Sequence, residues 1–193
     1  MSKCKIGFVF IIGFLLIACG RSPDSQFYVL NPLPPQKQVK NYSHLRIRID
    51  EIDSPAYTSK PQVLIHYTAQ QVKLEEFHRW AEGLDKNIQR VIEANLSTLL
   101  PGAAIVSSPW DLKFKPDYQL HLEISQFEVN IDGDSILRAN YIIYSEKQIR
   151  KKGSLNYRLR IPHPTVETLV ISMNTNLTHL TQDLARLFSS LNT

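Results

Sequence analysis

Hydrophobic and polar residues alternate along several stretches of the chain, which is the pattern of β-strands with one buried face. The longest stretch is residues 118–131, where the alternation changes phase and predicts a bulge near Ser125 and Gln126. Asp132-Gly133 follows as a hairpin turn, and residues 135–145 form the return strand. A further alternating segment at 155–161 completes a predicted antiparallel meander. Shorter β-prone segments lie at 27–30, 45–49, 63–67, 72–74 and 104–106.

Two other segments carry apolar residues at the three- and four-residue spacing of amphipathic helices. The first covers residues 84–99 and is ended by Pro101 and Gly102. The second runs from 166 to 191 after a capping Thr165, with a break expected near 174–176. The predicted fold class is α/β: a single domain with a mixed sheet of six or seven strands, including the meander, packed against two main helices. This domain is expected to span residues 41–193.

The first 19 residues show a different pattern. Two lysines in residues 1–5 precede an uncharged run of apolar and small residues at 6–18. This is the arrangement of a secretory signal peptide, and the run is shorter than the roughly 20 residues of a spanning helix. Leu16-Ile17-Ala18-Cys19 resembles a bacterial lipobox. We therefore expect residues 1–18 to be a lipoprotein signal peptide that is cleaved between Ala18 and Cys19.

The residue types at this junction fit the chemistry of lipidation. The peptidase needs a small side chain at Ala18, and the acylated residue must be a thiol nucleophile, Cys19. Several acyl chains, palmitate among them, make anchoring durable where one chain binds only marginally. Gly20 replaces the Asp that commonly retains lipoproteins at the inner membrane, so we expect the periplasmic face of the outer membrane. The alternative is an uncleaved N-terminal helix with an incidental cysteine.

The segment between the anchor and the domain contains few apolar residues. Residues 19–40 comprise the lipidated N-terminus, the short strand at 27–30 and a proline-rich stretch at 31–40. Three prolines in that stretch predict an extended tether or connector.

Composition excludes several classes of function. Without Lys3 and Lys5, 20 basic and 18 acidic residues leave a net charge of +2, too little to indicate nucleic-acid binding. After Cys19 the chain has no cysteine, and its six histidines form no metal-binding pair motif. No phosphate-binding or serine-hydrolase motif occurs. We therefore expect no metal, no cofactor and no catalytic residue.

Two groups of residues are candidate contact sites. Lys147, Arg150, Lys151 and Lys152, with Arg158 and Arg160, are placed at one basic hairpin end, within and after a charged turn at 146–152. Such a run is usually a solvated turn, and its functional alternative is contact with anionic lipid or an acidic partner. Trp80, just before the first helix, is expected to pack the entry loop against the sheet, with partner contact as the alternative.

Six short motifs lie in order along the mature chain: FYVL (27–30), SPAY (54–57), RWAEGLD (79–85), NLSTLLPG (95–102), SQFEVNIDGD (125–134) and LTQDLARLF (180–188). Together they resemble the PqiC/YmbA-type ABC-transport auxiliary lipoproteins. Gly83 stands where a proline is expected, and the loop at 108–115 does not align.

The resemblance implies an outer-membrane lipoprotein subunit of a trans-envelope lipid transport system that maintains envelope integrity. Its implied partners are a periplasmic tunnel protein with MCE domains and the inner-membrane partner of that protein. The resemblance also implies a homo-oligomeric ring, and it carries over only Cys19 as a site. One alternative is an envelope assembly or structural lipoprotein that bridges partners without lipid transport. Another is a periplasmic hydrolase using His66, His121 and Asp132.

Overall fold

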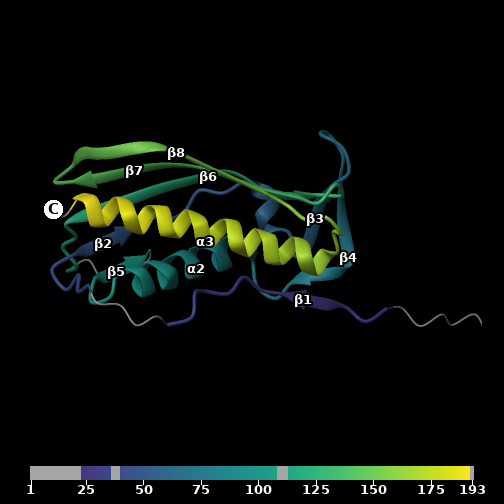
Figure 1. The fold of residues 1–193 in the computed structure, drawn as a ribbon, viewed down its shortest axis with the longest axis horizontal. Helices are drawn as coiled ribbons and strands as arrows, with labels where there is room; N and C mark the ends of the chain where they lie inside the picture. The colour runs from purple at the N-terminus through teal and green to yellow at the C-terminus, as the bar shows by residue number, and fades with distance from the viewer. Residues whose placement is uncertain (1–22, 36–39, 108–112, 192–193) are drawn as a thin grey trace, which may run out of the picture.

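The computed structural model describes residues 23–35, 40–107 and 113–191, and it arranges them as one mixed eight-stranded sheet with two helices on one face (Figure 1). This confirms the predicted α/β class. The elements follow in the order β1 (Gln26–Tyr28), β2 (Arg46–Ile49), a 3₁₀ turn η1 (Ala56–Ser59), β3 (Gln62–His66), β4 (Val72–Trp80), α2 (Leu84–Leu99), β5 (Ala104–Ser107), β6 (Tyr118–Asn130), β7 (Asp134–Ser145), β8 (Gln148–Arg160) and α3 (Val166–Leu191).

Strand β6 organises the sheet. On one side it pairs with β7, and β7 pairs with β8, which is the predicted antiparallel meander. On its other side, the first part of β6 pairs with β2 and the last part with β3, both in parallel. Strand β5 extends the sheet beyond β2, while β4 and then β1 extend it beyond β3. The predicted bulge is present, since the β6–β7 register shifts between Ile124 and Gln126.

These registers give the domain two different ends along its long axis (Figure 1). The β1 end comprises β1, the β3–β4 hairpin, the β6–β7 turn and the first two turns of α3. The hairpin end comprises the β7–β8 turn and residues 148–153 of β8. At about 3.3 Å per residue, the 13 residues of β8 separate the two ends by about 40 Å.

Helix α2 covers the sheet with one apolar stripe that includes Ile88, Val91, Ile92 and Leu96, all fully buried. It ends before Gly102, whose φ of +87° is the left-handed conformation that favours glycine. At its start, Gly83 has a φ of −54°, a value that proline also adopts. Glycine in place of the expected proline therefore leaves the backbone path unchanged.

Helix α3 is continuous from Val166 to Leu191, so the predicted break near 174–176 is wrong. The asparagines that suggested a break are held by tertiary contacts instead. Asn176 is fully buried and donates to the backbone oxygen of Ser135 at 3.0 Å and to its hydroxyl at 2.9 Å. The buried apolar residues of α3, from Leu169 to Phe188, pack on the same face of the sheet as those of α2.

Strand β4 is longer than the sequence predicts. Strand β4 runs through Trp80, well beyond the short continuation predicted at 72–74. The polar sequence of β4 does not predict this length. In the structure, the pairing of β4 with β3 is displaced by a bulge between Gln62 and Val63. With β4 counted as a full strand, the described residues contain eight strands rather than six or seven.

The start of the proline-rich stretch, predicted to be an extended tether or connector, is docked on the helices. The amide oxygen of Asn87 accepts from the backbone N–H of Leu30 at 2.6 Å, and Asn95 accepts from that of Leu33 at 2.6 Å. Asn174 of α3 accepts from the N–H of Asn31 at 2.9 Å. The side chain of Leu30 is fully buried. The asparagine clamp, as we call Asn87, Asn95 and Asn174, thus fixes the chain just after β1.

We predict that Asn95→Ala destabilises the domain by about 1–3 kcal/mol, because the substitution removes the acceptor of the Leu33 N–H and the donor to Thr181. Urea unfolding measures the loss. Ser97→Ala, on the exposed side of the same helix, is the matched control and should change the free energy of unfolding by less than about 0.5 kcal/mol. Equal effects of the two substitutions would contradict a role for the clamp.

Candidate attachment and partner-binding surfaces

The predicted cleavage residues Ala18 and Cys19 lie outside the described residues, but the structure describes where the chain enters the domain. Strand β1 forms one edge of the sheet and runs parallel to β4, with Gln26 opposite His78 and Tyr28 opposite Trp80. The Tyr28 hydroxyl lies 2.8 Å from His78 Nδ1. Within the ranges described, no helix has the length and apolar character needed to cross a bilayer.

The spacing between Cys19 and β1 limits how far a lipid at that cysteine can lie from the domain. Gln26 is the seventh residue after Cys19. A fully extended chain of that length spans at most about 25 Å. A lipidated Cys19 would therefore hold the β1 end close to the membrane surface.

Trp80 is the last residue of β4, and its side chain is 6% exposed within the core. Its backbone N–H donates to the carbonyl of Pro61 at 2.7 Å. This burial supports the packing role expected for Trp80 and argues against its use as a surface contact. Trp80 belongs to the hydrophobic core and lies four residues before α2 begins.

The basic residues Lys147, Arg150, Lys151 and Lys152 lie at the hairpin end. The predicted turn at 146–152 is wrong in extent, because only Glu146 and Lys147 form it, with φ values of +50° and +66°. These paired positive values match the tight hairpin turns whose twist suits antiparallel strands. Residues 148–154 already belong to β8 and are exposed. Three of the four cations therefore project from an ordered edge strand, not from a solvated loop.

A close cross-strand contact supports the exposed part of β8. Gly153 lies opposite Tyr141, and a Cβ at Gly153 would lie 2.9 Å from the Tyr141 hydroxyl oxygen and 3.2 Å from two of its ring carbons. The tyrosine ring thus covers the glycine backbone, a contact that a side chain at position 153 would disturb. This packing fixes the strand next to Lys151 and Lys152.

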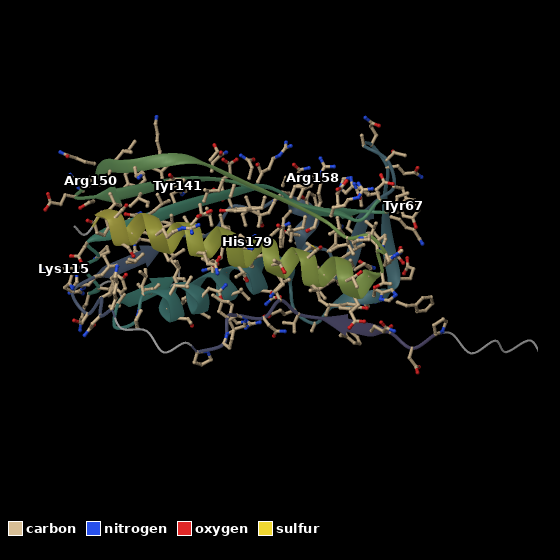
Figure 2. All side chains as sticks on the ribbon, viewed as in Figure 1. Tyr67, Lys115, Tyr141, Arg150, Arg158 and His179 are labelled. Atoms are coloured by element: carbon tan, nitrogen blue, oxygen red, sulfur yellow. The ribbon has the colours of Figure 1, made fainter. Side chains whose placement is uncertain are left out.

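Arg158 and Arg160 are not part of the hairpin end, contrary to the prediction. They lie at the opposite end of β8, and Figure 2 shows Arg158 far along the sheet from Arg150. Both bind Asp134, with distances to Asp134 Oδ2 of 2.9 Å from Arg158 and 3.0 Å from Arg160. Asn130 donates to the same carboxylate at 3.2 Å. Hydrogen bonds from Arg158 lower the pKa of Asp134 to about 2.

A second polar contact joins β8 to α3. The hydroxyl of Tyr157 donates to the Asp183 carboxylate, and its ring packs against the ring of His179 with centroids 6.0 Å apart. Burial, together with this hydrogen bond, raises the pKa of Tyr157 well above its usual value. Strand β8 is thus held toward its C-terminal end both by Asp134 and by α3, and its first residues remain available on the surface.

The histidines considered for a hydrolase are not brought together. His66 is level with Asn130 of β6, and His121 lies nine residues earlier on that strand, about 30 Å away along it. His66 lies 3.1 Å from Glu128, and His121 lies 3.8 Å from Asp53. Among the residues that the structure describes, no group of three or more His, Cys, Asp or Glu side chains is arranged to hold a metal ion.

Comparison with known proteins identifies a family for nearly all of the described chain. The sequence profile of the family described as "ABC-type transport auxiliary lipoprotein component" matches residues 28–185. The chain is 25% identical over 104 residues to the intermembrane transport lipoprotein PqiC of Escherichia coli (strain K12), and equally to that of Shigella flexneri. These alignments cover 54% of this chain and 54% of each relative, so the chain spans about half the length of the curated relatives it matches.

Solved structures share the fold. A crystal structure of an uncharacterized protein has a TM-score of 0.71 at 18% identity, covering 85% of this chain and 98% of its own. A crystal structure of a protein from Xanthomonas campestris has a TM-score of 0.69 at 11% identity, covering 83% and 93% of the two chains. At these identities the likeness concerns the fold alone.

We predict that Asp134→Asn lowers the free energy of unfolding by on the order of 1 kcal/mol at pH 7, since its two arginine partners are largely exposed and screened by solvent. The pKa of Asp134 is about 2 in the folded chain and 3.8 ordinarily, so its stabilisation is present above about pH 4 and is lost as the pH falls toward 2. Urea unfolding at several pH values between 7 and 2.5 measures this dependence.

Asp132→Asn is the matched control, because Asp132 is exposed in the same β6–β7 turn. It should leave stability nearly unchanged over that range. A destabilisation by Asp134→Asn that stays constant down to pH 2.5 would contradict the ionic contribution.

Proposed function

The chain belongs to the family of ABC-type transport auxiliary lipoprotein components, and from this membership we propose that it is an outer-membrane lipoprotein subunit of a trans-envelope lipid transport system. As an auxiliary component of a transport system, it is not an enzyme. The observation that carries the proposal is a lipidation motif placed seven residues before the first strand of a domain of this family. The curated relatives, named intermembrane transport lipoproteins, support the transport role.

The anchor is the first element of the proposed mechanism. Residues 1–18 direct export and are cleaved after Ala18, and acyl chains on Cys19 hold the protein at the periplasmic face of the outer membrane. Gly20, in place of an inner-membrane retention signal, supports the outer membrane as the destination. The short connection from Cys19 to β1 supports a domain that stays close to that membrane.

The partner is the second element. The domain docks a periplasmic tunnel protein with MCE domains, which in turn connects to an inner-membrane partner. The hairpin end is the docking surface that we favour, because it lies about 40 Å from the β1 end and the anchor reaches only about 25 Å. Its cations therefore suit an acidic partner better than the lipid head groups of the anchoring membrane. A homo-oligomeric ring with its axis along the membrane normal would present all its hairpin ends in one direction.

We predict that Cys19→Ser leaves the protein unprocessed or released from the outer membrane, because serine lacks the thiol that accepts the first lipid. Membrane fractionation and mass spectrometry of the mature N-terminus measure the outcome. The wild-type chain should begin at an acylated Cys19. A wild-type N-terminus at Met1 without lipid, or normal fractionation of the variant, would overturn the anchor.

We predict that Lys151→Glu/Lys152→Glu weakens recovery of the MCE-domain partner about tenfold, equivalent to about 1.4 kcal/mol, because two exposed attractive charges become repulsive. The effect should diminish at high salt. Membrane fractionation should be unchanged, since Cys19 is untouched.

The matched control is Lys60→Glu/Lys86→Glu, which makes the same change of charge at exposed positions outside the hairpin end. It should retain partner recovery. Equal losses in the two double variants would show a general effect of net charge. Recovery of a barrel-assembly or cell-wall partner in place of an MCE protein would favour the bridging alternative.

A further inference from the structure

Exposed apolar side chains are concentrated at the β1 end. Of the eight large hydrophobic residues that are exposed in the described part of the chain, seven lie at this end and one, Ile149, lies at the hairpin end. Single exposed apolar residues are ordinary on a protein surface, but such an asymmetry is not. The seven are Phe27, Val29, Tyr67, Val72, Phe77, Ile131 and Ile171.

These residues come from separate parts of the sequence, and the sheet brings them to one end. Phe27 belongs to β1 and is 65% exposed, while Phe77 belongs to the neighbouring β4 and is 40% exposed. Tyr67 lies at the β3–β4 turn, at the right in Figure 2. The backbone N–H of Ile131 donates to the carbonyl of His66 at 3.0 Å, which holds the β6–β7 turn beside the β3–β4 turn.

Two groups of charged residues at this end are paired within the domain. Lys73 lies 3.2 Å from Glu75, and Asp134 is enclosed by its two arginines. Pairing reduces the cost of bringing these groups toward a surface of lower polarity. Glu76, Asp132 and Glu167 are also exposed at this end, beside the aromatic and aliphatic side chains. Exposed aromatic and aliphatic side chains of this kind are typical of the boundary between lipid head groups and acyl chains.

The chain itself indicates what covers this end. Phe27 is eight residues after Cys19, so acyl chains on that cysteine place the β1 end within about 25–30 Å of the bilayer. We propose that the β1 end is a membrane-contact surface, with Phe27 and Phe77 inserted into the interfacial layer of the phospholipid bilayer that holds the anchor. This inference rests on the proposed lipidation of Cys19. The inference adds an orientation to the proposed lipidation: the β1 end faces the lipid and the hairpin end faces away.

The test uses the lipidated protein and the absence of other cysteines from the mature chain. Single variants Phe27→Cys, Phe77→Cys and Ile149→Cys each introduce one free thiol, because the Cys19 sulfur is occupied by lipid and Cys4 leaves with the leader. Each thiol is labelled with a nitrobenzoxadiazole fluorophore. The labelled proteins are reconstituted in phosphatidylethanolamine–phosphatidylglycerol vesicles that contain lipids with a nitroxide at a shallow acyl position. Ile149, 53% exposed, is the matched control at the hairpin end.

Labels at positions 27 and 77 should lose about half or more of their fluorescence to the nitroxide lipids, since interfacial side chains lie about 5–10 Å into that boundary. The label at position 149 should match the background. Quenching at 27 and 77 should persist at high salt, because the contact is apolar. Two independent positions keep the test informative if one variant fails to fold.

Three results would overturn the inference. Equal quenching at all three positions would remove the orientation. Protection of positions 27 and 77 that rises with the number of proteins per vesicle, without lipid quenching, would assign this surface to a second copy of the chain. Mass spectrometry that finds no lipid on Cys19 would remove the anchor and this inference together, whereas lipidated but unquenched protein would leave the proposed function standing.

Discussion

The orientation of this domain depends on how its N-terminal segment is attached to the helices. The side chains of the asparagine clamp accept hydrogen bonds from the backbone N–H groups of Leu30, Asn31 and Leu33. The Leu30 side chain is buried in the core. Asn87 and Asn95 are buried, and buried amides that satisfy backbone donors are costly to lose, so the segment is held against the helices. Because β1 immediately precedes the clamp, the chain always leaves the domain at the β1 end.

With this fixed exit point, the lipid proposed on Cys19 would orient the domain as well as anchor it. A flexible linker from residue 19 to residue 40 would let the domain take any orientation relative to the membrane. A connection of only seven residues to a paired strand would restrict that orientation. The distribution of surface chemistry agrees with one orientation: apolar side chains at the β1 end and unpaired cations at the hairpin end. The long β6–β7–β8 meander separates these two surfaces and carries the basic one away from the anchor.

Strand β8 shows how a sheet edge is kept ordered while its surface stays exposed. Asp134 holds its C-terminal end through Arg158 and Arg160, and the adjacent Tyr157 bonds Asp183 of α3. At the other end, the Tyr141 ring over Gly153 supports a section that no helix covers. Exposed lysines on an edge strand also discourage unwanted strand pairing. The basic surface is therefore presented on a rigid element.

The sequence alone determined the fold class, both helices, the bulge in β6 and the lipidation motif, because each depends on local periodicity, turn chemistry or a contiguous motif. It did not determine the length of β4 or the separation of Arg158 from Lys151, since both follow from strand register, which is set by pairing partners distant in the chain. The sequence did not predict the role of the clamp asparagines. In the helical pattern, Asn87 and Asn95 occupy ordinary polar positions, and Asn174 suggested a helix break. Only the tertiary structure decided their role, by placing backbone donors of residues 30–33 against amides from two helices.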